Sequence, residues 1–115
     1  MASSITRSDF ETLVRDALDA LPGWLQPYLD GVSVQVEDAP PPSDPDLYGL
    51  YEGVPFGEDA AGSLPPVISV FYETLAADFG SDRAELAREV RITVAHELAH
   101  HFGFDERRLD ELGYG

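Results

Sequence analysis

Residues 82–103 read DRAELAREVRITVAHELAHHFG, and this stretch decides the fold. Ser81 or Asp82 can cap the start of a helix, and Glu85 completes a capping box from Asp82. Gly103 suits the left-handed turn that ends many helices. A helix of about 21 residues would be about 30 Å long, enough to span a small domain. Apolar residues recur through the segment at helical spacing, at Leu86, Val90, Val94 and Leu98.

All three histidines of the chain lie near the end of this helix. His96 and His100 are separated by about 40° around a helix, one turn above the other, so both imidazoles can reach one Zn²⁺ at about 2.0–2.1 Å. Glu97 can contact a water on the metal rather than the metal itself, which is the arrangement of HExxH zinc hydrolases. His101 points about 140° away from His96, so we expect it to be packed or hydrogen-bonded instead of metal-bound.

A catalytic zinc usually takes a third protein ligand and keeps one position open. In the extended pattern HExxHxxGxxH/D, the glycine allows a sharp turn that returns the residue three positions further on to the metal. Here the glycine is Gly103 and the returning residue is Glu106. Asp105 is the alternative third ligand, and Asp110 and Glu111 are further candidates.

The remaining segments predict a small α+β architecture around the long helix. A capping box at Ser8 and Glu11 opens an apolar helical pattern that runs from Phe10 to Leu21 and stops at Pro22. The order of elements predicts an N-terminal helix, a mainly three-stranded sheet beside the HExxH helix, and a short C-terminal helix. The expected strands cover 32–36, 47–51 and 67–72, and the expected short helices cover 74–79 and 105–112.

Length and composition narrow the function. The 115 residues fit one domain, 1–115, and a hydrophobic content of 43% excludes a disordered chain. The 22 acidic residues against 7 arginines give a net charge of −15, which repels nucleic acid and favours basic partners, although it also serves solubility. Without cysteine, any metal must be held by imidazole and carboxylate.

We expect a cytoplasmic protein with no membrane contact. The N-terminus lacks the apolar core of a signal peptide, and no apolar run approaches the roughly 18 residues of a membrane span. The sequence makes no prediction of the oligomeric state.

Three segments resemble a known family, the small bacterial zincin-like metallopeptidases, also called minimal metalloproteases or mini-zincins. They are Val36 to Asp38, Leu47 to Pro55, and the run from Val94 to Tyr114 that contains the HExxH motif. The likeness spans nearly the whole chain. The chain itself differs from the metzincins. Those enzymes have a methionine turn below the metal, and the only methionine of this chain is Met1.

The resemblance implies a reduced zincin fold, zinc bound by His96 and His100, and a general base at Glu97. The family's third-ligand position usually carries aspartate, whereas this chain has Glu106 there. What the family cleaves is poorly defined, so the resemblance implies a chemistry without a substrate.

The leading hypothesis is a zinc-dependent peptidase in which Glu97 takes a proton from the attacking water. Tyr114, Tyr72 or Arg107 could stabilise the oxyanion, and the strand at 67–72 could pair with an extended peptide if it lies at a sheet edge. The alternative is a non-catalytic metal-binding or protein-interaction module. Hydrolysis of an RNA phosphodiester is a third hypothesis, which the negative charge disfavours.

Overall fold

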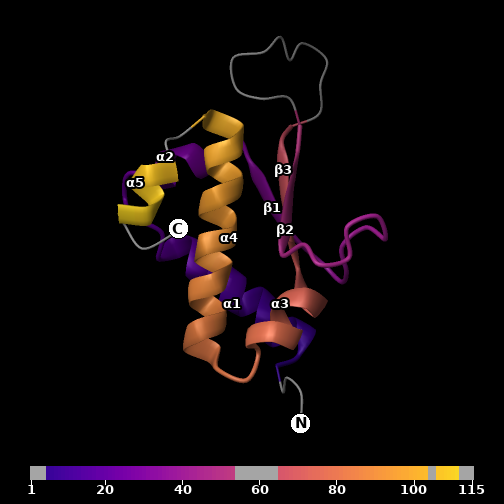
Figure 1. The fold of residues 1–115 in the computed structure, drawn as a ribbon. Coiled ribbons are helices and arrows are strands. Elements are labelled where there is room, and N and C mark those ends of the chain that lie inside the picture. The colour runs from indigo at the N-terminus through magenta and orange to yellow at the C-terminus, as the bar shows by residue number, and fades with distance from the viewer. Residues whose placement is uncertain (1–4, 54–64, 104–105, 112–115) are drawn as a thin grey trace.

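The computed structural model describes residues 5–53, 65–103 and 106–111, without the side chains of Glu106, Arg108 and Asp110 (Figure 1). This part of the chain has the expected α+β architecture, in which a small three-stranded sheet lies beside the long helix α4. The elements are α1 (Arg7–Asp19), α2 (Gln26–Leu29), β1 (Ser33–Glu37), β2 (Gly49–Glu52), β3 (Val67–Phe71), α3 (Tyr72–Phe79), α4 (Arg83–Phe102) and α5 (Glu106–Glu111).

The sheet has the order β1-β3-β2, so its last strand in sequence is its central one. β1 runs parallel to β3, with Val34 opposite Ile68, and β2 runs antiparallel to it, with Gly49 opposite Val70. The expectation that 67–72 could accept a peptide at a sheet edge is therefore wrong, because both sides of β3 are already paired. Among the described strands, β1 and β2 form the edges.

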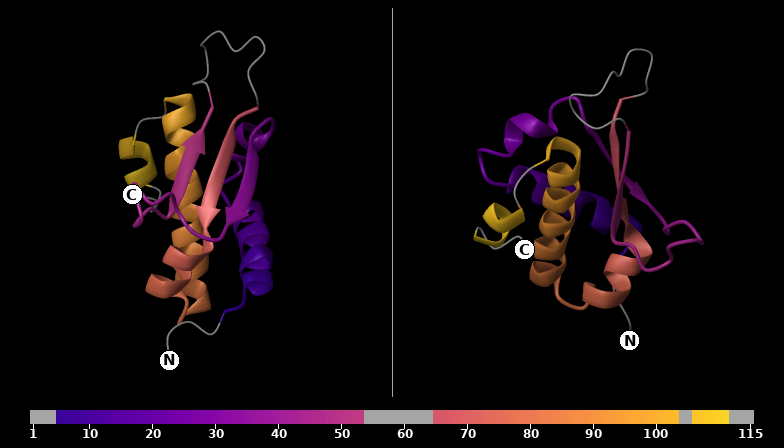
Figure 2. Two further views of the ribbon diagram at one scale, coloured as in Figure 1. Left: turned by 90° about the vertical axis from the view of Figure 1, so that its right-hand side faces the viewer. Right: turned by 45° about the horizontal axis from the view of Figure 1, so that its top comes forward.

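The described helices lie on one side of the sheet, where α4 packs on β2 and β3 and is itself contacted by α1, α3 and α5. Figure 2 shows the three strands side by side in front of α4 and α1. Ile68 and Val70 of β3 point into this helical layer and are completely buried. The side chains of α4 that meet them are also fully buried, and they are the residues whose spacing predicted the helix: Leu86, Val90, Val94 and Leu98.

The end residues of α4 are as the sequence predicts, but the capping box at its start does not form. The Asp82 carboxylate accepts hydrogen bonds from the N–H groups of Ala84 and Glu85, at 3.0 and 3.2 Å. The N–H of Asp82 itself donates to the Phe79 carbonyl, so Glu85 does not close the predicted box. Gly103 ends the helix with a φ of 73°, the left-handed conformation that glycine adopts without strain.

The cap of α1 differs from the prediction. The helix begins at Arg7, and the Thr6 hydroxyl accepts from the N–H of Asp9 at 3.0 Å, so Ser8 is not the cap. Thr6 and Ser8 both precede an acidic residue by three positions and are locally equivalent. The earlier start brings the Arg7 guanidinium to the Val36 carbonyl, at 2.8 Å, and to the Asp38 carboxylate. Contacts with β1 thus select the cap.

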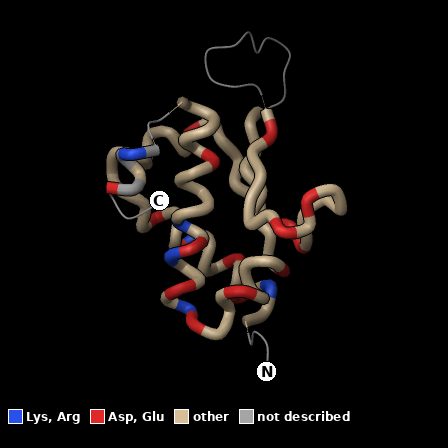
Figure 3. Tube along the Cα trace, viewed as in Figure 1, with Lys and Arg blue, Asp and Glu red and all other residues tan. Residues whose placement is uncertain are grey.

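Acidic side chains of the described residues are spread over helices, strands and the loop after β1 instead of forming one patch (Figure 3). The described part of the chain also contains no helix with the length and apolarity to cross a bilayer.

Candidate metal centre

His96, Glu97 and His100 lie on the last two turns of α4, where the helical period brings the two imidazoles to one side. The His100 side chain is 58% exposed, whereas that of Glu97 is only 16% exposed. The Glu97 Oε1 atom lies 3.8 Å from the His100 Nδ1 atom, beyond the range of a hydrogen bond. His100 therefore faces solvent, His96 is half-buried, and the carboxylate of Glu97 beside them is largely shielded.

The edge strand β2 provides that shielding. It lies along the row of α4 residues spaced four apart, Thr93, Glu97 and His101. A Cβ atom placed on Gly49 would be 2.5 Å from the Thr93 Cγ2 atom and 3.8 Å from the Glu97 Cγ atom. The strand backbone thus passes directly beside Glu97, and only a glycine allows this approach.

His101 is packed and hydrogen-bonded, as predicted, and lies on a different side of the helix from His96 and His100. Its side chain is 7% exposed, and its Nδ1 atom lies 2.6 Å from the Tyr51 hydroxyl of β2. Burial lowers the pKa of His101 and raises the pKa of Tyr51, so both groups are uncharged at neutral pH. On the other side of the turn, the ring of Phe102 meets that of Tyr28 edge-on at 4.9 Å.

The third ligand remains a prediction. Asp105 and the side chain of Glu106 lie outside the described residues, and so does the side chain of Asp110. Among side chains that the structure describes, no three histidine or acidic groups converge on one point. Two imidazoles followed by candidate carboxylates are nevertheless a donor set that zinc accepts. Gly103 has the left-handed conformation, and α5 begins three positions later at Glu106.

One candidate for oxyanion stabilisation is wrong. The Tyr72 hydroxyl donates to the Ile5 carbonyl at 2.7 Å, and its ring packs edge-on against Phe10. Tyr72 begins α3, which lies at the opposite end of α4 from the histidines (Figure 1). Arg107 is exposed on α5 and stays a candidate, whereas Tyr114 lies outside the described residues.

Sequence reasoning missed Gly49 and Tyr51 as parts of this site. Both belong to the Leu47 to Pro55 segment that carries the family resemblance, but their partners lie more than forty positions away. The sequence shows that Gly49 and Tyr51 lie on one face of a predicted strand. It does not show which helix residues this face contacts.

A family model described as zincin-like metallopeptidase matches residues 29–115, which is more than half of the chain. The chain belongs to the zincin-like metallopeptidase family. The resemblance inferred from the motifs is thereby confirmed, and family membership implies a metal, typically zinc, and hydrolase chemistry of the peptidase type. The matched region includes all three strands and α4, whereas α1 precedes it. A comparison with curated proteins gave no match.

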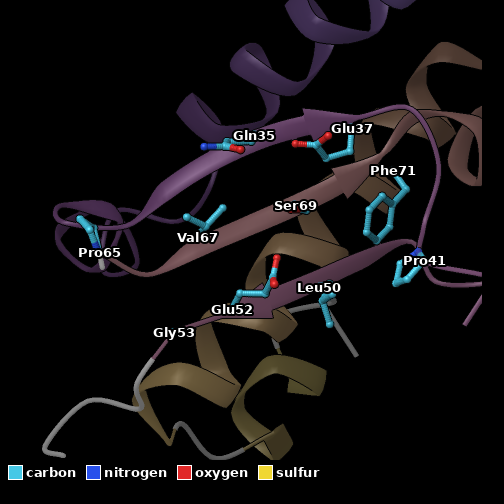
Figure 4. Close-up of a pocket in the computed structure, with 10 residues that line it drawn as sticks. All are labelled: Gln35, Glu37, Pro41, Leu50, Glu52, Gly53, Pro65, Val67, Ser69 and Phe71. Atoms are coloured by element: carbon cyan, nitrogen blue, oxygen red, sulfur yellow. The ribbon is translucent and has the colours of Figure 1, made fainter. Parts of the chain in front are cut away.

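A separate hollow lies on the sheet face that points away from the helices (Figure 4). Its volume is about 710 Å³, and neither the two histidines nor Glu97 of the candidate metal centre lines it. Glu37 and Glu52 border it from the two edge strands. The remaining lining residues are Gln35, Pro41, Leu50, Gly53, Pro65, Val67, Ser69 and Phe71.

Proposed function

We propose that this zincin-like protein is a zinc-dependent peptidase. His96 and His100 would hold the metal, with Glu106 as third ligand and Asp105 as the alternative. The observation that carries the proposal is the position of the Glu97 carboxylate, which is 16% exposed between the histidine face of α4 and β2.

Bound zinc would supply the Lewis acidity that activates a water and polarises a carbonyl. Glu97 takes a proton from the water as its oxygen attacks the peptide carbon, and then delivers that proton to the leaving amine as the C–N bond breaks. Its partial shielding favours this role, because a carboxylate held in one place transfers protons more effectively than a mobile one.

The edge strand β2 is the proposed binding place for an extended peptide substrate. Among the described strands, β2 pairs only with β3, so no described strand occupies the other side of its backbone, where an extended peptide could pair. Gly49 brings this edge next to Glu97. A peptide paired with β2 would therefore have its carbonyl groups near the catalytic carboxylate. The charge of −15 favours basic peptides.

The test is cleavage of a diverse peptide mixture by protein loaded with one equivalent of zinc. We expect Glu97→Gln to lower cleavage by at least about 100-fold, the lower end of what general acid–base catalysis contributes. Glu89→Gln is the matched control, since Glu89 lies two turns earlier on α4 with a similarly shielded side chain, 22% exposed. Identical cleavage by wild type and Glu97→Gln would end the peptidase proposal.

The hollow bordered by Glu37 and Glu52 favours a second candidate, a module that binds a basic partner and keeps the metal site without turnover. Zinc binding without cleavage of any peptide in the mixture would favour this candidate.

A nuclease assay with zinc tests the phosphodiester hypothesis, and we expect no cleavage of RNA because the chain carries a charge of −15.

A further inference from the structure

We propose that Tyr51 is a positioning residue of the metal centre. Its hydrogen bond to His101 fixes the last turn of α4 against β2, and this turn carries His100 and leads through Gly103 to the third-ligand region. The inference rests on the proposed function, because it assigns Tyr51 a role toward the zinc that His96 and His100 would hold.

The first support is that β2 meets α4 at two defined points. At Gly49 the strand backbone approaches Thr93 so closely that a Cβ atom would collide with it. Two residues further along the same face, the Tyr51 hydroxyl reaches His101 at 2.6 Å. Glu97 lies between these points in the row of α4 residues that faces the strand. The two contacts together set the register between strand and helix on both sides of Glu97.

The second support is that this hydrogen bond is partly shielded from water. The ring centroids of Tyr51 and His101 are 4.8 Å apart, and the His101 side chain is 7% exposed. Removing one partner of such a bond leaves the other poorly solvated, so the contact favours one arrangement of the turn over its alternatives. Since His101 directly follows His100 in the same turn, a shift of one moves the other.

The third support is that ring contacts also hold the turn. Phe102 contacts the ring of Tyr28 at 4.9 Å and that of His101 at 4.3 Å. These contacts, and the ring of residue 51 itself, would persist in Tyr51→Phe. We therefore expect Tyr51→Phe to stay folded. The last turn of α4 would lose only the hydrogen bond at His101, the residue next to the proposed ligand His100.

The matched control is Tyr48→Phe, which also deletes one hydroxyl from the same segment. The Tyr48 hydroxyl bonds to Asp78 of α3 at 2.5 Å, away from the last turn of α4. Zinc affinity is measured by chelator competition on intact protein. We expect Tyr51→Phe to weaken zinc binding by about tenfold, as the loss of a residue that supports metal ligands typically does, and Tyr48→Phe to leave it unchanged. Equal zinc affinities in the two variants would overturn the inference.

Changes at the partner residue separate positioning from general packing. His101→Asn keeps a polar atom near the place of Nδ1 and should retain most of the zinc affinity. His101→Leu should weaken zinc binding as Tyr51→Phe does, and the double variant should be no weaker than either single one, because both remove the same bond. Additive losses in the double variant would contradict a role through this bond.

Amide hydrogen exchange of the metal-free protein tests the inference without zinc. The amides of 99–103 should exchange faster in Tyr51→Phe than in wild type or Tyr48→Phe, because the turn opens more readily. Unchanged exchange would refute the positioning role. If wild type itself bound no zinc, the proposed function would fail, and this exchange comparison would still decide whether Tyr51 holds the turn.

Discussion

Among single residues, Gly49 shows how a position without a side chain can shape a site. A Cβ atom there would be 2.5 Å from the Thr93 methyl group and 3.1 Å from the Ser69 carbonyl oxygen. The methyl group has little freedom to rotate away, since the Thr93 hydroxyl donates to the Glu89 carbonyl at 2.8 Å. Any larger residue must therefore push β2 away from Thr93 and Glu97.

We expect Gly49→Ala to lower the free energy of unfolding by about 1–3 kcal/mol, the usual effect of overpacking a tight contact. Gly23→Ala is the control, because a Cβ atom on Gly23 would have no neighbour within 4 Å. Urea titrations of both variants measure the difference. Equal stability of the two variants would show that β2 does not pack on Thr93 as described.

Tyr48 gives a prediction for alkaline pH. Its hydrogen bond to Asp78, together with burial, raises the pKa of Tyr48 from 10.0 to about 12. Since the folded pKa exceeds the unfolded value, this group contributes stability below pH 10 and loses it as the pH rises toward 12. The free energy of unfolding should fall more steeply between pH 10 and 12 in wild type than in Tyr48→Phe. Parallel curves from denaturant titrations would contradict this linkage.

Spacing in one segment was enough to predict that His96, Glu97 and His100 lie together on a helix, but not which residues surround them. His96, Glu97 and His100 fall on one helix, so their relative placement follows from the helical period. Gly49 and Tyr51 act on partners more than forty positions away, and local pattern contains no such information. The third ligand, Glu106 or Asp105, stays a prediction.

At the level of elements, periodicity predicted every described strand and the long helix, with boundaries within about two residues. It could not predict the strand order, because alternation reveals which residues face a core without naming the neighbouring strand. The apolar run Val67–Phe71 becomes the central strand, and the edge strand that passes beside Glu97 of α4 is β2. The prediction of Ser8 as the α1 cap was wrong for a related reason. The contact of Arg7 with the Val36 carbonyl of β1 favours a start capped by Thr6, and local sequence does not reveal that contact.

The start of α4 gives the prediction at this scale. Asp82→Ala removes the side chain that accepts from two N–H groups of the first turn, and should lower the free energy of unfolding by about 1 kcal/mol. Ser81→Ala is the matched control, because Ser81 was the other candidate cap and makes no capping bond in α4. Urea titrations of Asp82→Ala and Ser81→Ala measure the two changes in the free energy of unfolding. A larger loss in Ser81→Ala would move the cap to Ser81.

Over the whole molecule, the core and the two candidate metal ligands His96 and His100 lie on opposite sides of α4. The buried side of the helix packs on the sheet and α1, whereas on the other side His100 is exposed and His96 is half-buried. We therefore expect folding not to depend on zinc as it does in a zinc finger. We expect protein treated with EDTA to keep its far-UV circular dichroism and cooperative thermal unfolding. Loss of the cooperative transition without metal would contradict this independence.

The central claim is that two imidazoles at the end of α4 hold a metal. The most direct test is the zinc content per chain, measured by native mass spectrometry for wild type and for His96→Ala combined with His100→Ala. We predict one zinc ion per wild-type chain and none in the double variant. A wild-type chain that takes up no zinc, or a double variant that retains it, would contradict the account.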